Sequence, residues 1–245
     1  DSFTFDGGLT STTSDTTLAG SFTTSADNVA LAAVSLNNTT SFTTAGGSFS
    51  AGTINGANAL SITAGAGNIT LGAVGATTAL TSLTIASAAN VTFSSTVRTT
   101  GSLTQVAGTG TTTLNGSSGN GISGSLSLTT ASVQFNTAPM AVGGAITVVA
   151  PTINLAASTG LTAAGDITLT AAGGHFTQAA TAPIVSTSNT ATAIGITVNS
   201  AGNAVLGRLT ADAGTLTITA NGGGAMSDNN DGSSVIVNLS AKNIA

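Results

Sequence analysis

The feature that most constrains this chain is a short motif that returns about every 20 residues along its whole length. Each copy places an apolar residue, called the anchor below, within two positions after Ser or Gly, and Thr follows the anchor in most copies. Eight of the ten steps between successive anchors are 20 or 21 residues long. This period indicates a solenoid, because a propeller blade needs roughly 40 residues. The anchors are Phe22, Phe42, Ile62, Leu83, Leu103, Leu126, Ile146, Ile167, Ile196, Leu216 and Ile236.

Apolar and polar residues alternate within each unit. In the unit that begins at Ile62, apolar residues stand at Ile62 and Ala64 and again at Ile69 and Leu71. Alternation by two is the period of a β-strand, and the intervening "GAGN" has the composition of a turn. A four-residue strand cannot be stable alone. Stacked coils solve this problem, because each strand pairs in parallel with its equivalent in the next coil and the inward side chains form one shared core.

We therefore predict an all-β fold, a single right-handed parallel β-helix (β-solenoid) over residues 1–245 with 20–21 residues per coil and eleven or twelve coils. Right-handed crossovers are the rule for parallel strands, and a coil spacing of roughly 4.8 Å gives a rod on the order of 50 Å long. Residues 1–20 are expected to form a looser first coil. The two long anchor steps predict corner loops near 115–121 and 179–190. Neither end carries a capping helix or charged lid, so we expect a segment of a longer exoprotein.

Composition excludes several classes of partner. Only 4% of the residues are charged, and the three cations are Arg98, Arg208 and Lys242. Nucleic acids bind to clustered Lys and Arg, so they are not expected partners. The chain has no Cys, which excludes disulfides and thiolate metal sites. No apolar run approaches the roughly 18 residues of a membrane helix, so we expect no membrane insertion.

The residue after each anchor is expected to point outward, so that these residues form a surface ladder. The simplest explanation is structural, because Thr is favoured in strands and stacked Thr side chains stabilise one another. A regular hydroxyl surface would also suit an ice-binding solenoid that orders water, or sugar binding and glycosylation. The predicted ladder consists of Thr23, Thr43, Thr63, Thr84, Thr104, Ser127, Thr147, Thr168, Thr197 and Thr217.

Two segments resemble binding motifs only in part. In "SDNNDGSS", Ser227, Asn229 and Asp231 have the alternate spacing of a calcium loop, but position twelve is Asn238 instead of a bidentate Glu. A polar turn is the simpler interpretation, and Ca²⁺ is a weak candidate ligand. The segment "GNGISG" (119–124) has the glycine spacing of the dinucleotide fingerprint, yet a strand-like "SLSLTT" follows it where a helix is needed. No cofactor is expected.

The titratable residues do not predict an active site. His175 has no Cys, Glu or second His with which to share a metal ion. Glycoside hydrolysis needs paired carboxylates, whereas Asp27, Asp166 and Asp212 fall at different places in the repeat. We therefore predict that the protein is not an enzyme.

The aligned units "GDITLTAAG", "GAGNITLGAV" and "GTLTITANGG" resemble the repeats of filamentous haemagglutinin-type exoproteins and, more loosely, of autotransporter passengers and other giant bacterial surface proteins. The resemblance covers nearly the whole chain and concerns the style of the repeat. It implies a right-handed β-helix at a bacterial cell surface that acts as an adhesin, fibre or toxin stalk.

The functional hypothesis is a non-enzymatic structural and adhesive shaft of an exported protein, located extracellularly or on the bacterial surface. Its expected partners are neighbouring coils and cell-surface glycans. One alternative is a self-assembling fibre subunit in which the last coil of one chain pairs with the first coil of the next. The other is the ice-binding solenoid.

Overall fold

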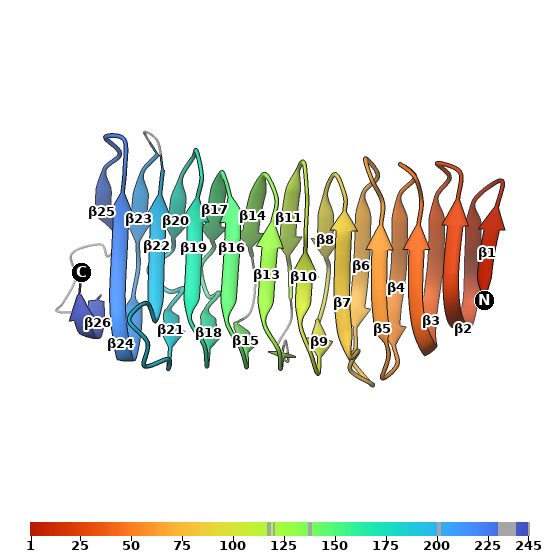
Figure 1. Cartoon of the computed structure of the whole chain (residues 1–245), viewed down its shortest axis with the longest axis horizontal. Coiled ribbons are helices and arrows are strands. Elements are labelled where there is room, and N and C mark those ends of the chain that lie inside the picture. The colour runs from red at the N-terminus through yellow and green to blue at the C-terminus, as the bar shows by residue number, and fades with distance from the viewer. Residues whose placement is uncertain (117–118, 120, 137–138, 200–201, 230–238, 245) are drawn as a thin grey trace.

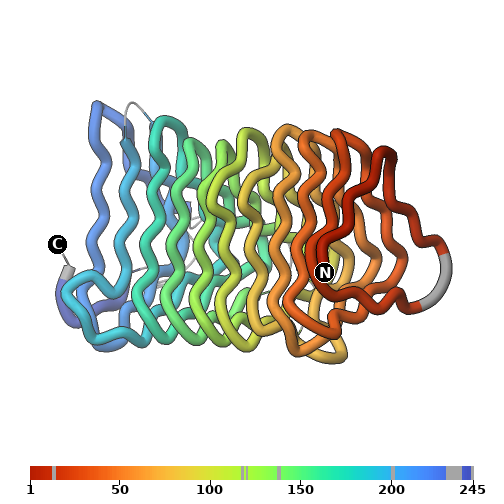
Figure 2. The backbone as a smooth tube through the Cα atoms, turned by 45° about the vertical axis from the view of Figure 1, so that its right-hand side comes forward, coloured from red at the N-terminus to blue at the C-terminus, as the bar shows by residue number. Residues whose placement is uncertain are grey.

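The chain is an all-β, right-handed solenoid of parallel strands, as predicted. The computed structural model describes residues 1–116, 119, 121–136, 139–199, 202–229 and 239–244. Seen along the axis from its N-terminal end, the chain turns clockwise as it recedes, and successive coils stack side by side along the rod (Figures 1 and 2). No helix that could cross a membrane occurs within these described ranges.

The strands form three faces that run the length of the rod. Face A contains most of the described anchors. Its strands are β1 (Ser2–Phe5), β5 (Ala59–Thr63), β7 (Ser82–Ser87), β10 (Leu103–Gln105), β13 (Leu126–Thr129), β16 (Ile146–Ala150), β19 (Ile167–Ala171) and β22 (Ile194–Val198). Face B lies behind it in Figure 1 and contains β6 (Ile69–Val74), β8 (Val91–Phe93), β11 (Thr111–Leu114), β14 (Ser132–Phe135), β17 (Thr152–Leu155), β20 (Phe176–Gln178), β23 (Ala204–Leu206) and β25 (Met226–Asp228).

Face C is the narrowest and carries short strands, namely β9 (Arg98–Thr99), β12 (Gly121–Ile122), β15 (Met140–Val142), β18 (Leu161–Ala163) and β21 (Ile184–Ser186). Near the two ends of the rod, longer strands bend around corners and contribute to more than one face. These are β2 (Leu9–Thr24), β3 (Val29–Thr43), β4 (Phe49–Asn55), β24 (Leu209–Ala220) and β26 (Leu239–Ile244).

Inward side chains of successive coils form one continuous apolar core between the faces. At the N-terminal end this core is aromatic, because the rings of Phe3, Phe22 and Phe42 stack with centroid separations of 5.1 Å at each step. Phe3 is 42% exposed at this end of the described rod. The ten described anchors are all buried, and Ile236 lies outside the described residues.

The anchors lie in two neighbouring inward files, whereas the sequence alignment placed them in one. Ile62 pairs with Ile85, and Leu83 pairs with Leu60. Farther along, Ile167 pairs with Ile194, so that Ile196 lies two residues out of the predicted register. The reason is that both residues of an inward pair are apolar, and a two-residue slip leaves the alternating pattern unchanged.

The structure has about ten turns, slightly fewer than the eleven or twelve predicted. The prediction counted a looser first coil and an ordinary last coil anchored at Ile236, whereas Ile244 holds the register position beside Leu216. In the predicted loop 179–190, residues 184–186 form β21, paired with β18 and β24. The extra residues lie instead in two corners, a longer one at 187–193 and a shorter one at 172–175. The predicted loop 115–121 lies partly outside the described residues, and its last residue begins β12.

Candidate functional site

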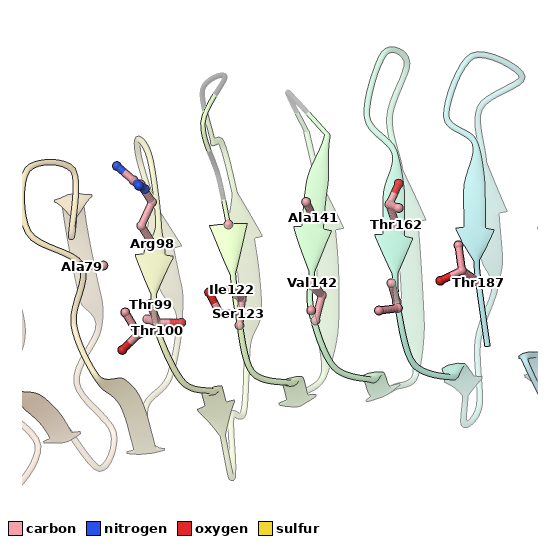
Figure 3. Close-up of a pocket in the computed structure, with 14 residues that line it drawn as sticks. Ala79, Arg98, Thr99, Thr100, Ile122, Ser123, Ala141, Val142, Thr162 and Thr187 are labelled. Atoms are coloured by element: carbon pink, nitrogen blue, oxygen red, sulfur yellow. The ribbon is translucent and has the colours of Figure 1, made fainter.

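A groove of about 550 Å³ runs along face C, and its lining residues come from six successive coils (Figure 3). Four coil steps separate Thr100 from Thr187, so this row of the lining extends roughly 19 Å along the rod. Its volume lies within the range of roughly 300 to 1,000 Å³ that is usual for ligand sites. The lining residues are Ala79, Arg98, Thr99, Thr100, Gly121, Ile122, Ser123, Ala141, Val142, Gly143, Thr162, Ala163, Ala164 and Thr187.

The hollow exists because outward side chains on the middle coils are very small. Gly121 and Ala141 pair in register on one side of the floor, and Gly143 and Ala164 lie on the other. A Cβ atom at Gly143 would lie 2.3 Å from the carbonyl oxygen of Ser123 in the preceding coil. No real Cβ approaches a backbone oxygen so closely, so the narrow floor requires glycine there. The sequence accordingly leaves an exposed backbone surface in the centre of the groove.

Polar groups gather toward the two ends of this groove. Arg98 stands at the N-terminal end, and Ala141 and Thr162 lie in the same row along the axis (Figure 3). The guanidinium of Arg98 is exposed and makes one hydrogen bond to the described residues, from Nη1 to the carbonyl oxygen of Ala76 at 3.3 Å. Exposed hydroxyls of Ser123 and Thr187 lie on the opposite side. The groove therefore offers one cation, several hydroxyls and a bare floor.

The predicted Thr ladder is divided between two outward files of face A. Thr23, Thr43 and Thr63 pair in one file, whereas Thr84 pairs with Ser61 in the neighbouring file. The second file is nearly continuous in hydroxyls, and it comprises Ser21, Ser41, Ser61, Thr84, Thr104, Ser127, Thr147, Thr168, Gly195 and Thr217. Thr197 returns to the first file, where Thr170 and Thr219 are its neighbours. The same two-residue shifts that divide the anchors divide this ladder.

The first file carries apolar interruptions. Val106 follows the last residue of β10 and is 57% exposed, and Val149 on β16 is 36% exposed. Face A therefore presents one hydroxyl file beside a mixed file. Ser41 Oγ donates to Ser21 Oγ at 2.9 Å, which is a direct contact along the hydroxyl file.

The acidic residue Asp166 fixes a corner. Its Oδ1 accepts hydrogen bonds from Ser188 Oγ at 2.5 Å and from Thr190 Oγ1 at 2.6 Å. These hydroxyls belong to the extra residues 187–193, so Asp166 ties the inserted corner to the preceding coil. Asp27 lies in a separate corner of the N-terminal part, where its backbone oxygen accepts from Thr24 Oγ1 at 2.7 Å.

The remaining predicted site residues do not converge. His175 Nδ1 accepts a hydrogen bond from the backbone N–H of Asn203 at 3.0 Å. Within the described residues, no group of three or more His, Cys, Asp or Glu side chains could hold a metal ion. In the weak calcium candidate, Ser227 lies on β25 and Asn229 Nδ2 donates to the carbonyl oxygen of Gln178 at 2.8 Å. Asp231 lies outside the described residues.

Sequence reasoning missed two buried glutamines in the core. Gln178 is fully bonded, since its Nε2 donates to Ala182 and Arg208 and its Oε1 accepts from Gly207. Gln105 occupies an inward file position between Ile85 and Leu128, and its Nε2 has no hydrogen-bond partner in the described structure. The available signal was a polar residue at a repeat position that is apolar in a neighbouring coil, since Gln105 pairs with Ile85 and Gln178 pairs with Leu155.

No family model matches this chain, and no curated protein or solved structure is significantly similar to it.

Proposed function

We propose that this chain is a stiff, non-enzymatic shaft of an exported bacterial surface protein. A shaft holds other parts of a protein at a distance and must carry load along its axis. The resemblance of the repeats to haemagglutinin-type exoproteins and autotransporter passengers supports this role and an extracellular location. Weak contacts repeated along such a surface would gain strength by multivalency.

The observation that carries the proposal is the uninterrupted pairing of the interior coils. In the central coil, β13 pairs with β10 and β16, β14 with β11 and β17, and β15 with β12 and β18. Each face therefore hydrogen-bonds to both neighbouring coils. Because these bonds run parallel to the rod axis, an axial pull loads all the bonds of one coil interface together.

Optical tweezers attached to the two ends of the chain test the proposal. A shaft should resist force as intact coils and then lose them in steps, each releasing about 60 to 67 Å for 20 residues. Extension without discrete steps at the lowest forces would contradict a load-bearing role.

A coil deletion provides a matched control for length. Removing 125–144 joins Gly124 to Ala145 and keeps the register of Leu103 with Ile146, so small-angle scattering should show a folded rod shortened by about 4.8 Å. Removing 125–134 alone breaks the register and should unfold neighbouring coils.

The fibre subunit is a second candidate, because Phe3 on β1 is exposed and would be available to pack against the last coil of another chain. An end-to-end contact does not close on itself and would produce filaments. Sedimentation velocity distinguishes the two functions. The shaft stays a single species as concentration rises, whereas filaments that disappear on Phe3→Asp would favour the subunit.

A further inference from the structure

We propose that the groove on face C binds a linear glycan that carries carboxylate groups, with its chain parallel to the rod axis. This inference goes beyond the shaft, which does not depend on any ligand. It rests on the shape of the floor, the distribution of hydroxyls and the position of Arg98.

The shape of the groove favours an extended ligand. The groove is open and follows the axis for four coil steps, from Thr100 to Thr187. A compact ligand would contact only one or two coils. A pyranose unit in a linear glycan is about as long as the coil spacing, so successive sugars would meet successive coils in equivalent positions.

The floor suits the apolar face of a sugar ring. Gly121, Ala141, Gly143 and Ala164 place flat aliphatic and backbone surface at the centre, where larger side chains would block a ring. Exposed hydroxyls nearby, including those of Ser123 and Thr162, donate or accept hydrogen bonds with sugar hydroxyls.

An extended peptide fits less well. Peptides commonly bind to sheets by pairing with a free strand edge. Here β12 and β15 are each paired on both sides, so their backbone groups are already used. A strand lying along the axis would also repeat every two residues, at roughly 6.6 Å, which does not match a coil spacing of roughly 4.8 Å.

Arg98 is the reason to expect an acidic ligand. A guanidinium has five N–H donors in a fork that matches a carboxylate. Arg98 uses one of its nitrogens for Ala76, at 3.3 Å, and is exposed at the groove end. The other groove-lining residues are uncharged. A carboxylate at this end would gain an ion pair without facing an opposing acidic side chain in the lining.

The test uses a short oligogalacturonate as the acidic probe and a cello-oligosaccharide of equal length as the neutral probe, with binding followed by NMR titration of the folded chain. The acidic probe should bind more tightly and shift the resonances of the groove. Exposed ion pairs are weak, so Arg98→Gln should raise its Kd about two- to fivefold. Lys242→Gln removes the same charge from β26, away from the groove lining, and should leave the Kd unchanged.

A steric variant provides an independent arm. Ala141→Trp fills the middle of the groove and should abolish binding, whereas Thr70→Trp on exposed face B should not. Circular dichroism checks that each variant is folded. Equal affinity for the two probes, no binding of either, or binding insensitive to both groove variants would overturn the proposal. Preferential binding of an extended peptide in the groove would overturn it as well. The force measurements on the shaft are unaffected by any of these outcomes.

Discussion

The pair of Gln105 and Thr112 offers a sharp test of how the core is stabilised. Thr112 Oγ1 donates to Gln105 Oε1 at 2.6 Å, both residues are buried, and the Nε2 of Gln105 has no partner in the described structure. An unpaired buried donor costs about 1 to 3 kcal/mol, whereas the hydrogen bond contributes only about 1 kcal/mol. We therefore expect the double variant Gln105→Leu/Thr112→Val to be about 1 to 2 kcal/mol more stable than the wild type.

The neighbouring coils support this choice of side chains. Thr112 pairs between Val91 and Val133, so Val continues an existing file. Leu at position 105 would follow the same file as Leu128. The substitutions therefore extend apolar stacking that the adjacent coils already contain.

The single variants complete a thermodynamic cycle. Thr112→Val leaves the whole amide of Gln105 unpaired and should lose about 1 to 3 kcal/mol, and Gln105→Leu leaves the Thr112 hydroxyl unpaired and should change stability little. Thermal unfolding followed by circular dichroism measures all four proteins, and about 2 to 4 °C is expected per kcal/mol in a chain of this size. A double variant less stable than the wild type would refute the reasoning, because the amide must then have a favourable partner inside the rod.

Three further predictions concern the corners and surfaces. Asp166→Ala removes two charge-assisted hydrogen bonds and should cost about 1 to 3 kcal/mol, with faster hydrogen exchange and proteolysis at the corner 187–193 as the measured signs. The thermal midpoint should be the same in EDTA and in Ca²⁺, and a rise in Ca²⁺ that depends on the segment 227–234 would establish binding there. Freezing solutions of the wild type should show no thermal hysteresis. Hysteresis that is lost on Thr84→Lys/Thr104→Lys, two neighbours in the hydroxyl file, would favour the ice-binding alternative.

The fold was predictable from the sequence because one pattern recurs in every coil and each copy supports the same interpretation. The register was less predictable, since Leu83 and Ile85 are both apolar and either could follow Ile62. The predicted loop 179–190 was misplaced because "PIVS" has the pattern of a strand, although it begins with Pro183, and its last three residues form β21. The groove was not predicted at all. It arises from small residues such as Gly121 and Ala141, which become neighbours only when coils stack in the observed register.

The pairing of each interior coil with both of its neighbours has a consequence for how such a rod forms. During folding, a coil that has formed presents unpaired backbone groups along its strands, so it serves as the template for the next coil. A two-residue error in the register of one coil would be repeated in every coil that forms on it later. A local irregularity such as the bulge between β5 and β7 breaks the regular alternation, and it would therefore restrict the register that the next coil can adopt.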